Sequence, residues 1–213
     1  LNIKDLSFKE QSGLHVKALT GELTANRQRA SLLHLTCVLP STSISFGQIT
    51  ASYAFNGTQF QSPSFQFSGS LQRSKLALAD LACFLPELKT STKPFFLQAD
   101  VSGTSTSLRV KTLEISSRAN NFSLQADGSI SNWTSKLRWA TTINRLRVSA
   151  EGVQFLSDNF ANHFKVPAVI GRLGNIDYIG EAGGYGQDVA TKGIIRTDAG
   201  TATVAFGRHN DNF

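Results

Sequence analysis

Apolar and polar residues alternate through most of this sequence, and no other feature constrains the fold as strongly. In NFSLQADGSI, residues 121–130, every second residue is apolar or glycine, and polar residues occupy most of the positions between. Successive side chains of a strand point to opposite faces, so each such strand has one apolar and one polar face. The pattern therefore predicts a mostly β protein. The same alternation occurs in SLLHLTCVLP (31–40), ITASYAF (49–55), SFQFSGSL (64–71), KLRWATTI (136–143) and TATVAFG (201–207).

Some of these segments change phase midway. In LRVKTLEI the apolar set moves from Leu108 and Val110 to Leu113 and Ile115, and LHVKALTGEL, residues 14–23, shows a similar change. A slip of one residue is typical of a β-bulge, which bends the strand. We therefore predict an elongated, curled antiparallel or mixed sheet, shaped like a taco, with an apolar groove and one or two short helices.

Turn and helix signals separate the predicted strands. Asn56-Gly57 and Asp127-Gly128 are residue pairs that favour tight turns. Apolar residues at helical spacing predict a short helix over 78–85, which Pro86 ends. A second helix is predicted over 158–165, with Asp158 as its N-cap.

The segment from Pro86 to Gly103 has a counterpart 81 residues later, from Pro167 to Gly184. At this offset Phe95 falls on Ile176 and Leu97 on Tyr178, so the phase of the alternation is kept. We interpret residues 1–213 as a fragment of one elongated β-rich domain with a repeat boundary near 150–166. The chain opens on a strand pattern without an initiator Met or a signal peptide, so we expect a piece of a longer protein.

Charge and composition limit the partners. The net charge is +6 and the pI about 9.6, but the basic residues lie singly between apolar ones. A nucleic-acid-binding protein usually gathers them on one face, so we expect no nucleic acid partner. No apolar run approaches the roughly 20 residues of a membrane-spanning helix.

Motifs for catalysis or metal binding are missing from the sequence. It contains no Walker loop, no HExxH and no G-x-S-x-G, and its four histidines are scattered. We therefore expect no enzymatic activity, no cofactor and no metal site. Cys37 and Cys83 are interpreted as small buried apolar residues, and the sequence leaves a disulfide between them open.

The apolar rows themselves are then the candidate site. We predict that they share the concave face of the curled sheet and form a groove for lipid acyl chains. Composition alone equally allows two sheets packed face to face around a closed core. The predicted groove residues are Leu33, Leu35, Leu39, Phe65, Phe67, Phe95, Leu97, Phe122, Leu124, Ile176, Tyr178, Val204 and Phe206.

Two long segments resemble the TamB family, the translocation and assembly module components, which belong with the AsmA-like, bridge-like lipid transfer proteins. Residues 79–116 carry Asp80-Leu81, Leu85-Pro86, a strand that ends in glycine, and a following strand. Residues 166–206 carry a proline, Leu173-Gly174 and a Thr-Asp-x-Gly turn. Residues 6–46 are similar as well, so the resemblance covers nearly the whole chain. Ala77 departs from the family pattern, where a helix-capping Ser or Thr is expected.

The resemblance implies a place and a function. TamB-like proteins are anchored in the inner membrane of Gram-negative bacteria and extend through the periplasm of the cell envelope. The family is associated with phospholipid transport to the outer membrane, with outer-membrane biogenesis and with an Omp85-type β-barrel partner. By this resemblance the chain is a periplasmic segment whose groove transfers phospholipid acyl chains, and its membrane anchor lies N-terminal to it.

Two other interpretations remain open at the level of sequence. One is a β-sandwich interaction or adhesin-like module, whose apolar faces are buried in a closed core. The other is an all-β hydrolase acting on an acidic polysaccharide.

Overall fold

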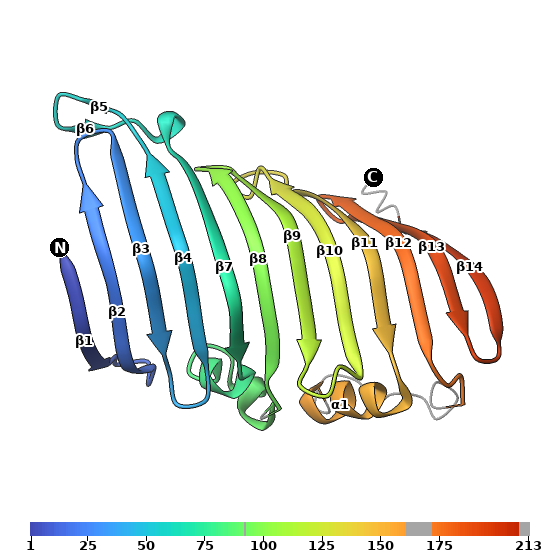
Figure 1. Cartoon of the computed structure of the whole chain (residues 1–213). Helices are drawn as coiled ribbons and strands as arrows, with labels where there is room; N and C mark the ends of the chain where they lie inside the picture. Colours follow the sequence, from blue (N-terminus) through green and yellow to red (C-terminus); the bar gives the residue numbers. More distant parts are fainter. Residues whose placement is uncertain (92, 161–171, 209–213) are drawn as a thin grey trace.

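The computed structural model describes residues 1–91, 93–160 and 172–208, and over these residues the protein is one large open sheet (Figure 1). Twelve described strands pair antiparallel in chain order, from β1 at one edge to β14 at the other, and a separate β5–β6 hairpin interrupts the order. Strands make up 64% of the described residues, so the prediction of an open, mostly β sheet is confirmed. No second sheet lies over it in the part described, so the fold is not a sandwich.

The large sheet and the hairpin have the following strand bounds: β1 Asn2–Lys9, β2 His15–Ala25, β3 Arg29–Val38, β4 Ser43–Ser52, β5 Phe55–Asn56, β6 Gln59–Phe60, β7 Gln66–Leu76, β8 Phe95–Thr104, β9 Ser107–Ser117, β10 Phe122–Ser131, β11 Arg138–Val148, β12 Ile176–Tyr185, β13 Asp188–Thr197 and β14 Gly200–Arg208. The described helical elements are α1 Ala150–Phe160 and the 3-10 turns η1 Ser62–Ser64, η2 Leu78–Leu81 and η3 Pro86–Thr90.

The phase changes of the sequence are β-bulges, as predicted. Between β8 and β9 the register shifts by one residue at Lys111, since Asp100 pairs with Thr112 but Val101 pairs with Val110. β2 carries register shifts against both of its neighbours. Each bulge returns the apolar side chains to one face of the sheet.

One predicted turn is wrong. Asp127 and Gly128 lie inside β10, where Asp127 pairs with Thr142 and Gly128 with Thr141. A Cβ atom on Gly128 would lie 2.6 Å from the carbonyl oxygen of Ala140. The glycine is therefore explained by the close approach of β11, whereas Gly57, with φ of +62°, does form the predicted hairpin turn.

Both predicted helices need correction. Within residues 78–85 only Leu78–Leu81 are helical, as the short 3-10 turn η2, and Pro86 begins η3 instead of ending a helix. The second helix begins at Ala150, so Asp158 lies within α1 and is not its N-cap; residues 161–165 and Pro167 lie outside the described residues. Ser149 is the cap, because its Oγ accepts a hydrogen bond from the Gly152 N–H. The Ser149 hydroxyl also donates to Glu151 and lowers the pKa of that carboxyl.

The helix α1 packs against one end of the sheet and forms the main apolar core. Phe155 contacts Phe95 at a ring-centroid distance of 4.9 Å and stacks on Phe122 at 6.3 Å. Together with Val148, these three rings are more than nine-tenths buried. In Figure 1, α1 and η3 lie along the same edge of the sheet, where β9 and β11 end. The core thus occupies one end of the strands and leaves the rest of each strand outside it.

Polar contacts join η3 to the end of α1. Ser91 is fully buried and donates its hydroxyl hydrogen to the carbonyl oxygen of Asn159, while Asn159 Oδ1 accepts from the Lys93 N–H. The Lys93 ammonium forms an ion pair with Asp158 and lowers the pKa of this carboxyl, with a further hydrogen bond from Gln154. These contacts fix the two helical elements as one unit.

The 81-residue offset reappears in the strands. β8 and β12 begin at residues 95 and 176 and end at residues 104 and 185, so both bounds keep the offset.

Cys37 and Cys83 are free thiols, and partial burial raises the pKa of the Cys37 thiol. Over the described ranges, no helix has the length and apolar character to cross a membrane.

Candidate functional site

The sheet has an apolar face and a polar face, which the strand registers define. Residues in register across antiparallel strands share a face. One such row crosses seven strands and contains only apolar residues, so we call the side that carries it the apolar face. Its members, in order from β3 to β11, are Leu35, Phe46, Leu71, Ala99, Leu113, Ala126 and Ile143.

Most of the predicted groove residues lie on this apolar face. By register these are Leu35, Phe67, Phe95, Leu97, Phe122, Leu124, Ile176, Tyr178, Val204 and Phe206. Three residues stand apart from them. Leu33 pairs with Glu22 and Gln48 in a polar row, next to His34, whose φ of +50° marks a local change in the strand. Leu39 is buried in the turn after β3, and Phe65 precedes β7.

The apolar face is only partly covered. Leu97, Leu113 and Val101 are half-buried although they lie in the middle of the sheet. Toward the edge β14, Phe206 is 59% exposed. Because the described residues supply one sheet and a single helix at its end, the apolar side chains shield one another but have no opposing layer.

Aromatic rings cover glycines on the same face. The ring of Tyr178 lies over Gly180 and Gly193, where any Cβ atom would collide with it. A Cβ on Gly103 would lie 2.8 Å from the ring of Phe67. The rings of Tyr178 and Phe67 therefore cover the backbone of the sheet at these glycines.

The β5–β6 hairpin adds an aromatic cluster at the end of the sheet opposite α1 (Figure 1). Phe60 contacts Phe55 at 5.9 Å and Phe65 at 6.1 Å between ring centroids, and Phe65 contacts Phe67 at 5.9 Å. Phe55 and Phe60 are nearly half exposed. The apolar surface therefore continues from Phe67 onto the hairpin.

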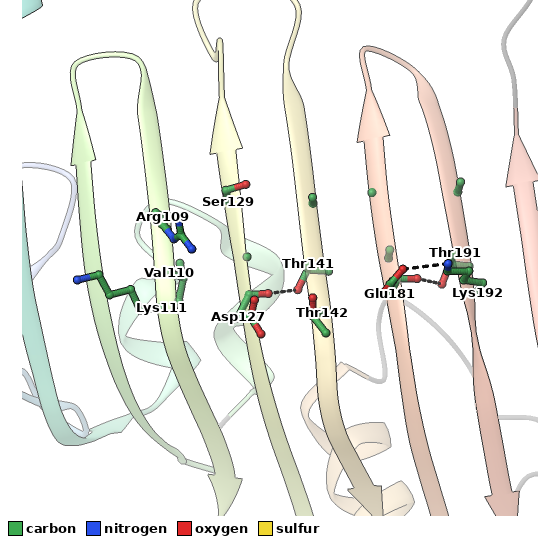
Figure 2. Close-up of a pocket in the computed structure, with 15 residues that line it drawn as sticks. Arg109, Val110, Lys111, Asp127, Ser129, Thr141, Thr142, Glu181, Thr191 and Lys192 are labelled. Carbon is green, nitrogen blue, oxygen red and sulfur yellow. Dashed lines mark hydrogen bonds and ion pairs between the residues drawn. The ribbon is translucent and has the colours of Figure 1, made fainter.

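The polar face carries a cavity of about 670 Å³ over β9–β13. Figure 2 shows Arg109 and Lys111 on one side of it, and Glu181 and Lys192 on the other. Lys192 Nζ lies 3.2 Å from Glu181 Oε2, so these two charges are paired. The sequence prediction did not include this cavity, because strand alternation marks a residue as polar without showing which polar side chains stand together.

Chemically, the two faces offer binding surfaces of opposite character. The described residues contain no group of three or more His, Cys, Asp or Glu side chains arranged to hold a metal ion. No family model, curated protein or solved structure matches this chain. The described residues thus define a single-layer antiparallel sheet whose apolar face is only partly covered.

Proposed function

We propose that this chain is a periplasmic segment of a TamB-like envelope protein, and that its apolar face contacts phospholipid acyl chains during their transfer between the inner and outer membranes. The observation that carries the proposal is the apolar row across seven strands, which has no opposing layer among the residues that the structure describes. A protein of this kind needs no nucleophile or cofactor, because the transfer breaks no covalent bond.

Burial of apolar surface would drive the binding of an acyl chain to this face. Removing apolar surface from water is favourable by roughly 25 cal/mol per Å². An acyl chain lying along the half-buried side chains would cover surface on the sheet and on itself together. Large exposed apolar patches on a protein are typical of interaction sites for partners or lipids.

The resemblance to TamB-like proteins supports the same interpretation. It supplies the further expectations of an inner-membrane anchor outside this chain and an Omp85-type β-barrel partner. The row continues in register as Gly180, Gly193 and Val204 through β12–β14, where the ring of Tyr178 with its hydroxyl covers the two glycines. A strip of this kind suits movement of a chain across the strands.

Photo-crosslinking tests whether acyl chains occupy this face. Benzoylphenylalanine placed at Leu97 should crosslink to phospholipid when the chain is expressed in its parent protein, whereas the same group at Gln98 should not. Leu97 and Gln98 are neighbours on β8 with opposite facing, since Leu97 pairs with Ile115 and Gln98 with Glu114. Mass spectrometry of the products gives the lipid yield at both positions. Equal lipid yields from the two positions would contradict the proposal.

A charge on the face gives a functional test. We expect Leu97→Arg to leave the sheet folded, because water reaches a half-buried side chain on an open face, while the parent protein loses lipid transport. Gln98→Arg, on the polar face, is the matched control and should keep both properties. Circular dichroism reports folding, and detergent sensitivity of the cells reports the outer-membrane barrier. A folded Leu97→Arg variant with a normal barrier would show that this segment does not carry lipid.

A further inference from the structure

A row of small side chains crosses the polar face through the cavity. It runs over eleven strands, or roughly 50 Å at the usual strand spacing. Arg109 is the one long side chain among its members, and it divides the row into a part rich in hydroxyls and a part made of Ala and Gly with Ser129. In order from β2 to β14 the row is Thr24, Ser31, Thr50, Ser68, Ser102, Arg109, Ser129, Ala140, Gly183, Ala190 and Gly207.

Arg109 extends into the cavity. Figure 2 shows its guanidinium between β9 and β10, whereas Lys111 extends toward β8. Over the described residues, Arg109 has no ion pair and no hydrogen bond from its side chain. The planar guanidinium therefore has its full set of donors free, a geometry that suits a carboxylate held by two hydrogen bonds.

Of the other charges of the cavity, Lys111 has no ion pair among the described residues and extends toward β8 (Figure 2), while the remaining three are paired or hydrogen-bonded. Glu181 pairs with Lys192, and Asp127 Oδ1 accepts a hydrogen bond of 2.9 Å from the amide of Asn144. The three basic residues and two acidic residues lining the cavity leave a formal charge of +1. This balance favours a carboxylate group, with its single negative charge, over a phosphate group, whose second negative charge Asp127 and Glu181 would repel further.

Hydrogen-bonding groups surround the place beside Arg109 where the negative charge of the ligand would lie. Ser129 and Thr142 offer hydroxyls, and the carboxylates of Asp127 and Glu181 accept hydrogen bonds from ligand hydroxyls. Ala140 and Gly183 form a flat floor on which the apolar face of a sugar ring fits. A volume of about 670 Å³ lies within the range of sites for small organic ligands.

We propose that this cavity binds a short acidic saccharide, with the carboxylate of one sugar unit on Arg109. The site lies on the face opposite the proposed lipid surface and is independent of it. The proposal therefore stands or falls separately from lipid transfer, and its test requires no lipid.

The test uses trigalacturonate as the probe and the neutral trisaccharide maltotriose as the control ligand. In titrations followed by calorimetry and by backbone amide NMR, trigalacturonate should shift the amide signals of β9–β13 and bind at least tenfold more tightly than maltotriose. Arg109→Gln should weaken binding at least tenfold. Arg196→Gln removes another exposed arginine of the polar face, outside the cavity, and should leave binding unchanged.

A second variant tests the floor without changing any charge. Ala140→Leu should reduce the affinity for trigalacturonate by filling the cavity, while circular dichroism shows a folded sheet. If Arg109→Gln and Arg196→Gln weaken binding equally, the binding is nonspecific charge attraction and the proposal is overturned. The proposal is also overturned if trigalacturonate does not bind, or if glycerol phosphate binds more tightly than trigalacturonate.

Discussion

Truncating Phe155 to alanine should lower the free energy of unfolding by about 3–5 kcal/mol, the usual cost for a buried phenylalanine. The ring is 8% exposed and contacts both Phe95 and Phe122. From α1 it thus contacts both β8 and β10. The ring's neighbours Phe95, Phe122 and Val148 belong to paired strands, so relaxation around the cavity left by its removal recovers little of the loss.

Urea denaturation followed by circular dichroism measures this effect. Phe206→Ala is the matched control, because the same side chain is removed from the edge strand β14, where it is 59% exposed. We expect the control to change stability by less than about 1 kcal/mol. Similar losses from the two variants would mean that the cluster around α1 is not the core of the domain.

Gly152→Ala should destabilise the protein by about 1–3 kcal/mol, the usual cost of overpacking. In an unconstrained helix the same change is stabilising by about 1 kcal/mol, so tertiary contact decides the sign. A Cβ atom at Gly152 would collide with the carbonyl oxygen of Asn121 and lie 3.0 Å from Val148 Cγ1. The glycine is what allows α1 to approach the β9–β10 turn this closely.

The midpoint of thermal unfolding distinguishes these two signs. Gly207→Ala, on β14, provides the control, since a Cβ atom there meets no atom within 4 Å. This control should leave the midpoint nearly unchanged. An increase in the midpoint for Gly152→Ala would show that α1 does not pack on the sheet as described.

The apolar face was predictable because a strand has a period of two. Phe95, Leu97, Phe122 and Leu124 belong to alternating segments, and each one lies on the apolar face. The phase change around Lys111 likewise predicted a bulge, because a strand returns its apolar residues to one side by adding a residue. These properties depend on residues close together in the sequence, so the sequence alone predicts them. Their use for lipid remains a proposal.

Other features depended on contacts that local order does not contain. The start of α1 was missed because Gly152 is a poor helix former in isolation, and it is the packing of Phe155 on Phe95 and Phe122 that stabilises the helix. Asp127-Gly128 has the residues of a turn, yet β9 and β11 lie on either side of this pair. Pairing with these two strands keeps its backbone in β10.

By itself, the sequence determined a mostly β protein: which segments favour strands, which side of each strand is apolar, and where bulges return that side to register. Only the tertiary structure decided that the described strands form one sheet without an opposing second sheet, that α1 covers one end of it, and that Arg109 stands in a cavity on the polar face. The physical reason is that alternation fixes the facing of a side chain within its own strand. Its neighbours across the sheet depend on register, and register is set by pairing between strands far apart in the chain.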